Sequence, residues 1–372
     1  MSSRLLLVAA LLAAGSAHAF DLADGRFSIA GYGQAAVGIT DGNESHGVGN
    51  TLDFVDPEFT LLVSARPIDE LFISVQAAFS PSGVEIDWAF FEWRFSDLLH
   101  LRIGSVKQPF GLLGETRDVG TLRPFFHPAE SVYNEATELS TDGLIGVGLL
   151  GHLETDHGWG VNYDLYAGQL RLGSNDMLDQ IAGYVPYATD GRPRPITEYN
   201  TGLLGGRLWL TTPIDGLSIA ASAYGTLYAS DEVTKLGDPE VKIAAGPSIE
   251  YLTEKWMIRA ELFFLFHEHD MRRFAAYAEA GYFVTQHLQP AVRLEYSDVG
   301  LFAGPRESIY THHREASFAL NYWFNRSAVV RLEYHLTYGN LLAHPEQFVD
   351  SFVAGTTPRF TNAVLLGSQF SF

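Results

Sequence analysis

This chain of 372 residues is poor in cysteine, basic side chains and long apolar runs. Cysteine is absent, which excludes a disulfide scaffold, a thiolate zinc site, an iron–sulfur centre and a cysteine nucleophile. Lysine and arginine number 24 against 44 acidic residues, and the resulting net charge of −20 argues against electrostatic binding of nucleic acid. At 47% hydrophobic residues the chain is nevertheless too apolar to be intrinsically disordered.

The first 19 residues have the pattern of a secretory signal peptide. Arg4 precedes an apolar run from Leu5 to Ala14, and a small-residue cleavage signal, A-H-A, ends at Ala19. The run is too short to cross a bilayer as a helix, and no later run approaches the length that a transmembrane helix needs. We therefore expect cleavage after Ala19 and one exported domain, residues 20–372, that is either soluble or inserted in a membrane as strands.

Apolar and polar side chains alternate through most of the mature chain, and this period of two is typical of β-strands. In Val84–Phe95 the alternation slips near Phe90–Phe91, which predicts a β-bulge. The pattern predicts sixteen strands in all: Phe27–Ile39, Glu58–Arg66, Leu71–Ser80, Val84–Phe95, Leu99–Lys107, Gly143–Leu153, Trp159–Leu170, Gly202–Thr211, Leu217–Leu227, Lys242–Leu252, Trp256–Phe266, Phe274–Val284, Leu288–Tyr296, Arg314–Trp323, Ala328–Thr337 and Asn362–Phe372.

The connections between these strands alternate between tight turns and longer loops. Every second connection is short, whereas most of the others are long, up to the segment Gln108–Asp142; Pro81–Gly83 and His267–Arg273 are short exceptions. An even number of strands with turns at one end and loops at the other is typical of bacterial outer-membrane barrels. The sequence therefore predicts an all-β fold, a transmembrane antiparallel barrel with periplasmic turns and extracellular loops. Alternation alone also fits a soluble β-domain with its apolar face inward, which remains the alternative.

The C-terminal strand supports the membrane alternative. It reads NAVLLGSQFSF, with Phe370 and Phe372 in phase on the apolar face, and it resembles the signal that outer-membrane proteins present to their assembly machinery. We therefore predict Phe370 and Phe372 as the assembly signal. The expected location is the Gram-negative outer membrane, with membrane lipid and the barrel assembly machinery as partners.

Charged residues on the polar faces come in pairs. Three strands carry an Arg-x-Glu motif in the same phase, within KWMIRAELF, QPAVRLEYS and SAVVRLEYH. Side chains two apart on a strand lie on one face, and sixteen strands leave room for an aqueous channel. The predicted pore-lining residues are Arg102, Arg207, Glu250, Arg259, Glu261, Glu279, Arg293, Glu295, Glu315, Arg331 and Glu333.

The segment between the fifth and sixth predicted strands carries the most distinctive motifs. A strand ends in R-I-G-x-x-K and is followed by P-F-G-L, E-T-R-D-V, L-R-P, S-V-Y and L-S-T-D-G. Over Leu101–Gly143 this series resembles the family of phosphate-selective-porin-like outer-membrane channels. The resemblance implies a sixteen-stranded barrel, commonly a homotrimer, in which Gln108–Asp142 folds into the pore as a constriction loop.

The net charge of this segment argues against selectivity for phosphate. Gln108–Asp142 holds six acidic residues against two basic ones, and the arginines of the Arg-x-Glu motifs are each accompanied by a glutamate. We therefore expect a porin for passive diffusion of small hydrophilic solutes or ions, weakly cation-preferring; an anion- or phosphate-selective porin is the alternative. The constriction residues are predicted to be Glu115, Arg117, Asp118 and Arg123.

Other constellations give weaker indications. His267-Glu268-His269-Asp270 could share a cation, but a solvated loop is the stronger interpretation because no further ligand follows at a defined spacing. His267, His269 and Asp270, or His312 and His313, are the candidates for a barrel enzyme, and no activated nucleophile can be identified. We predict no catalytic residue, metal or cofactor; an outer-membrane barrel enzyme or adhesin is the alternative of another class.

Overall fold

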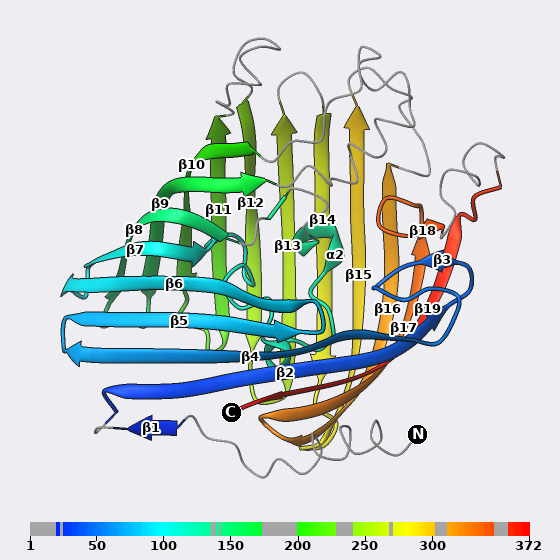
Figure 1. Ribbon diagram of the computed structural model, residues 1–372, viewed down its shortest axis with the longest axis horizontal. Helices are drawn as coiled ribbons and strands as arrows, with labels where there is room; N and C mark the ends of the chain where they lie inside the picture. Colours follow the sequence, from blue (N-terminus) through cyan, green and yellow to red (C-terminus); the bar gives the residue numbers. More distant parts are fainter. Residues whose placement is uncertain are drawn as a thin grey trace.

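A computed structural model describes residues 20–22, 25–134, 139–140, 143–172, 199–227, 241–267, 271–301, 311–345 and 356–372. Sixteen long strands form one closed antiparallel barrel (Figure 1). They are β2 (Phe27–Thr40), β4 (Asp53–Ile68), β5 (Leu71–Ser80), β6 (Gly83–Ser96), β7 (Leu99–Lys107), β8 (Gly143–Glu154), β9 (Gly160–Leu172), β10 (Tyr199–Thr211), β11 (Leu217–Leu227), β12 (Val241–Leu252), β13 (Trp256–His267), β14 (Met271–Tyr282), β15 (Leu288–Leu301), β16 (His312–Asn325), β17 (Ala328–Tyr338) and β19 (Phe360–Ser371).

Each long strand pairs with its neighbour in sequence, and β19 pairs with β2 to close the barrel. The predicted sixteen-stranded barrel is therefore confirmed. Closure satisfies the backbone groups of every long strand, which an open sheet in lipid could not do. The predicted signal peptide lies outside the described residues.

Five shorter elements complete the described structure. β1 (Phe20–Leu22) pairs with the start of β2, and β3 (Asn43–Glu44) pairs with β18 (His344–Pro345). The helices are η1 (Gly120–Leu122) and α2 (Glu130–Tyr133), both between β7 and β8. Within the described part of the chain, neither helix has the length or apolar character needed to cross a membrane.

A β-bulge lies in β6, but earlier than the predicted position at Phe90–Phe91. Asp87 is the extra residue, and it stands opposite the junction of Gln76 and Ala77 in β5. Its carboxylate accepts a hydrogen bond of 2.6 Å from Gln76 Nε2. The predicted position was wrong because adjacent apolar residues reveal a change of phase only after the bulge itself has occurred.

The apolar face of the strands is the outer surface of the barrel. Leu204 and Leu294 are 70% and 63% exposed, whereas Phe263 and Leu265, which point the other way, are fully buried. Exposed apolar side chains recur on the outward face of most strands, so the outer surface forms a continuous apolar belt. A belt of this kind is typical of a surface in contact with lipid.

The two C-terminal phenylalanines fill the seam where the barrel closes. A Cβ added at Gly31 would lie 2.6 Å from the Phe372 ring, and one added at Gly33 would lie 2.6 Å from the Phe370 ring. Both rings also lie near the Phe59 ring, whose centroid is 6.5 Å from that of Phe370 and 6.1 Å from that of Phe372. The glycines therefore make room for the terminal aromatic residues, and the role of these residues as an assembly signal stays a prediction.

Arginine substitutions at two depths of β15 test whether the belt faces lipid. We expect Leu294→Arg, at mid-strand, to lower the free energy of unfolding in a bilayer by about 2–4 kcal/mol. Leu288→Arg, at the strand end, should cost only about 0–1 kcal/mol because the charge reaches the interface. Equilibrium denaturation in lipid vesicles measures both values, and equal costs at the two depths would contradict a lipid-facing belt.

Candidate functional site

The segment after β7 folds into the barrel instead of extending from its rim; we call residues 108–134 the inner loop. Phe110 in this loop is fully buried. The centroid of its ring lies 4.4 Å from that of Phe263 in β13 and 5.2 Å from that of Tyr224 in β11. Further along, α2 packs against β14 and β15 (Figure 1). The apolar residues of the P-F-G-L motif therefore anchor the loop to the inner wall.

The inner loop also reaches β19. Thr121 Oγ1 lies 3.2 Å from Ser371 Oγ, near the end of the last strand, and Gln369 Nε2 donates a hydrogen bond of 3.0 Å to the Phe126 carbonyl. A Cβ added at Gly120 would lie 2.0 Å from the end of the Gln369 side chain, so a larger residue there would displace that side chain. The loop thus crosses the interior between strands that are far apart around the barrel.

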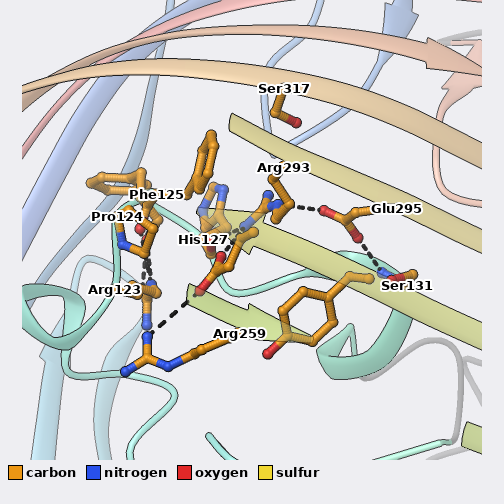
Figure 2. A network of polar contacts seen from close by, with 12 residues as sticks. Arg123, Pro124, Phe125, His127, Ser131, Arg259, Arg293, Glu295 and Ser317 are labelled. Carbon is orange, nitrogen blue, oxygen red and sulfur yellow. Dashed lines mark hydrogen bonds and ion pairs between the residues drawn. The ribbon is translucent and has the colours of Figure 1, made fainter. Parts of the chain in front are cut away.

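Glutamates of the three Arg-x-Glu motifs hold the inner loop by its backbone. Each carboxylate accepts a hydrogen bond from a buried backbone N–H, a charge-assisted contact that is stronger than one between neutral groups. Figure 2 shows one of them, Glu295, between Arg293 and Ser131. The three contacts are Leu112 N to Glu261 Oε1 (2.7 Å), Phe126 N to Glu333 Oε1 (2.6 Å) and Ser131 N to Glu295 Oε2 (2.7 Å).

The arginines of the same motifs also bind the loop backbone, but as donors: they donate hydrogen bonds to its carbonyl groups. Arg293 and Arg331 are fully buried, and burial of a charge is costly without such partners. The contacts are Arg259 Nη1 to Leu122 O (2.9 Å), Arg293 Nη1 to His127 O (2.9 Å), and Arg331 Nη2 to Gly120 O (2.9 Å) and Arg123 O (2.6 Å).

Wall-to-wall ion pairs complete this network. Arg259 contacts Glu250 at 2.6 Å and Glu279 at 3.5 Å, and Glu279 also lies 3.9 Å from Arg293. The residues predicted to line the pore on β13–β17 therefore face inward, but the inner loop covers many of them. The Arg-x-Glu residues among them bind the backbone of the loop, whereas Glu279 forms its ion pairs with arginines of the wall.

A second charged cluster fixes the start of the inner loop. Glu115 lies between Arg102 of β7 and Arg207 of β10, at 3.2 and 2.5 Å. These arginines also pair with wall carboxylates, Glu92 and Asp164, each at 2.9 Å. Burial alone would raise the pKa of Glu115, but Arg207 and then Arg102 outweigh it and lower that pKa. The carboxylate thus keeps its charge at neutral pH.

The remaining predicted constriction residues lie close to one another. Asp118 pairs with Lys107 and lies 3.7 Å from Arg117. Arg123 donates from Nε to the carbonyl oxygens of Phe125 and Phe126. Burial, followed by repulsion from Arg293, lowers the pKa of Arg123 to about 10, so its guanidinium stays charged at neutral pH.

A cavity of about 390 Å³ lies between the inner loop and the wall. Gln34 of β2 and Glu58 of β4 line it from the wall, and Asp118, Arg123 and other inner-loop residues line it opposite. The arginines contribute little surface, since Arg123 is 2% exposed, whereas the Asp118 side chain is 30% exposed and Glu58 is partly exposed. The accessible charge of the cavity is therefore mainly acidic.

Sequence analysis missed a second loop that reaches the same region. His46, between β3 and β4, is buried and lies 3.1 Å from Glu130 of α2 and 3.0 Å from Glu315 of β16. Burial alone would lower the pKa of His46, but Glu130 and Glu315 outweigh it and raise it well above its ordinary value. Nothing in the sequence near His46 indicates these partners, which are far away along the chain.

Two of the weaker sequence candidates, His312 and His313, are not among the residues that line the cavity. His312 lies 2.9 Å from Asp298, and His313 is buried 3.9 Å from both Glu295 and Glu315. Residues 268–270 of the possible cation cluster lie outside the described residues, as do the acidic residues at 135, 138 and 142.

Comparison with known proteins identifies the fold. No family model matches the chain, and no curated protein matches it. Among solved structures, OmpF of Salmonella typhi in complex with daunomycin has a TM-score of 0.60 and 11% identity over 95% of this chain and 100% of that one. The outer membrane channel DcaP of Acinetobacter baumannii has a TM-score of 0.60 and 9% identity over 96% and 100%. An anion-selective porin from Comamonas acidovorans has a TM-score of 0.57 and 10% identity over 93% and 99%.

Substitution of Glu261 tests whether wall carboxylates hold the inner loop. Glu261→Leu removes an acceptor whose bond to the Leu112 N–H is worth about 1.5–3 kcal/mol. We therefore expect the Leu112 amide to exchange its hydrogen roughly 10- to 100-fold faster in the folded barrel. Glu261→Gln keeps an acceptor oxygen and is the control, with a smaller effect. Unchanged protection of Leu112 in the leucine variant would show that the carboxylate does not hold the loop.

Proposed function

We propose that this protein is a porin of the Gram-negative outer membrane, a water-filled channel for passive diffusion of small hydrophilic solutes or ions. The observation that carries this proposal is the cavity between the inner loop and the wall at β2 and β4, inside a closed barrel with an apolar exterior. An apolar outside suits lipid, and a polar inside suits water. Assembly as a homotrimer, and insertion through the signal in Phe370 and Phe372, belong to the same proposal.

Passage through this channel requires no chemical step. The candidate residues form ion pairs and backbone hydrogen bonds that fix the inner loop, and the comparisons place outer-membrane channels among the structural neighbours. We therefore propose a channel rather than an enzyme or an adhesin. A barrel that carries no current in a planar bilayer would favour one of those alternatives.

The proposed selectivity is a weak preference for cations. Glu58 and Asp118 offer accessible negative charge at the cavity, whereas Arg293 and Arg331 are buried beneath the inner loop and bind its carbonyl groups. Buried arginines of this kind are not available to a passing phosphate. Fixed acidic charge at a narrow point attracts cations, and salt screens it beyond about 8 Å at physiological ionic strength.

Zero-current potentials in a potassium chloride gradient test this selectivity. We expect a modest cation-selective potential for the native channel that declines as salt rises. The double variant Glu58→Gln/Asp118→Asn should shift the potential toward anions. Asp69→Asn, in an exposed turn between β4 and β5, is the control and should leave the potential unchanged. A strongly anion-selective native channel, or current blocked by millimolar phosphate, would instead support a phosphate-selective porin.

A further inference from the structure

Three potential metal ligands meet where the 41–52 loop enters the barrel. His46 comes from this loop, Glu315 from β16 and His335 from β17, and their side chains are almost completely buried. His46 Nε2 lies 3.0 Å from Glu315 Oε2, and His335 Nδ1 lies 2.9 Å from Glu315 Oε1. One ligand atom from each residue lies within 4.8 Å of the others. This grouping plays no part in the channel proposed above.

The other nitrogen of each imidazole faces a carboxylate of its own. His46 Nδ1 lies 3.1 Å from Glu130 Oε1, and His335 Nε2 lies 3.1 Å from Glu333 Oε2. Histidines that bind metals generally donate their second N–H to a carboxylate, which fixes the ring and raises its basicity. In this cluster, Glu130 and Glu333 are already placed to accept these hydrogen bonds from His46 and His335.

Hydroxyl groups orient the shared carboxylate. Thr337 Oγ1 donates to Glu315 Oε2 at 2.8 Å, and Ser317 Oγ donates to Glu315 Oε1 at 2.6 Å. Glu315 is thus held between the two imidazoles by both of its oxygens. A preorganised carboxylate of this kind favours a bound ion because less conformational freedom is lost on binding.

The backbone delivers His46 into this position in an uncommon conformation. Ser45 and Val48 exchange two backbone hydrogen bonds of 3.0 Å, and between them His46 and Gly47 have φ angles of 53° and 72°. Positive φ at both central residues is a type I′ turn, which normally takes Asn-Gly. His46 is the one non-glycine residue with positive φ among those described. Histidine rather than asparagine here places an imidazole beside Glu315.

We propose that His46, Glu315 and His335 bind a divalent transition cation of the Zn²⁺ class. Two imidazoles and one carboxylate form a ligand set typical of zinc, with a fourth position for water. Donor atoms around tetrahedral zinc lie roughly 3.3 Å apart, and one donor atom from each of the three residues already lies within 4.8 Å of the other two. Calcium and magnesium are poorer candidates because they require six or more oxygen ligands or several retained waters.

The ion has a route in and a structural effect. Glu130 and His127 line the cavity, and Glu130 contacts His46, so an ion in the cavity reaches the cluster beside these side chains. The bound ion joins the 41–52 loop to β16 and β17, and through Glu130 it secures the inner loop as well.

Metal titration of the purified mature barrel in detergent, freed of metal with a chelator, tests this site. Titration with zinc chloride against a competing fluorescent chelator should give one tight site per chain. His46→Asn and His335→Gln should each weaken binding more than about 100-fold, and Glu333→Gln about 10- to 100-fold. His152→Gln, which removes a half-exposed histidine elsewhere, is the matched control and should bind as the native chain does.

Two further measurements separate loss of the site from loss of the fold. Asparagine suits a type I′ turn, so His46→Asn should remain folded, which the altered gel mobility of unheated barrels reports. X-ray absorption of the zinc-loaded native protein should show two imidazole nitrogens and carboxylate oxygen at about 2.0–2.2 Å. Absence of a stoichiometric site, or equal affinity in folded His46→Asn, would overturn the proposal. Neither measurement depends on channel current.

Discussion

The structure depends on hydrogen bonds between the Arg-x-Glu motifs of the wall and the backbone of the inner loop. Each arginine donates to loop carbonyl groups and each glutamate accepts a loop N–H. Neither side is stable alone, because unpaired buried ions and buried backbone groups are both costly. The motifs therefore stabilise an irregular segment inside the barrel, where a regular strand pairing is not available to it.

Placement of this loop explains the character of the interior. A sixteen-stranded barrel leaves an aqueous lumen, and the inner loop fills much of it, covering the arginines of β15 and β17. The cavity that remains lies against β2 and β4, where Glu58 and Asp118 supply accessible charge. The buried Arg-x-Glu side chains thus hold the inner loop in place, whereas the less buried Glu58 and Asp118 are accessible to solutes in the cavity.

Much of the fold could be predicted from the sequence, because alternation and turn chemistry are local. Leu71–Ser80 and Leu217–Leu227 were predicted with the bounds that the structure has. The position of the bulge at Asp87 was not, since it depends on the pairing with β5. Burial of Arg293 and Arg331, and the approach of His46 to His335, depend on contacts between segments far apart in the chain, which spacing does not encode.

An engineered disulfide tests most directly whether the loop crosses the barrel. The chain has no cysteine, and the hydroxyls of Thr121 and Ser371 lie 3.2 Å apart, so Thr121→Cys/Ser371→Cys places two thiols in contact across the interior. Oxidation of the folded double variant should consume both thiols within one chain, as free-thiol labelling measures, and reduction should restore them. Thiols that stay fully reactive after oxidation would place the loop outside the barrel and contradict this account.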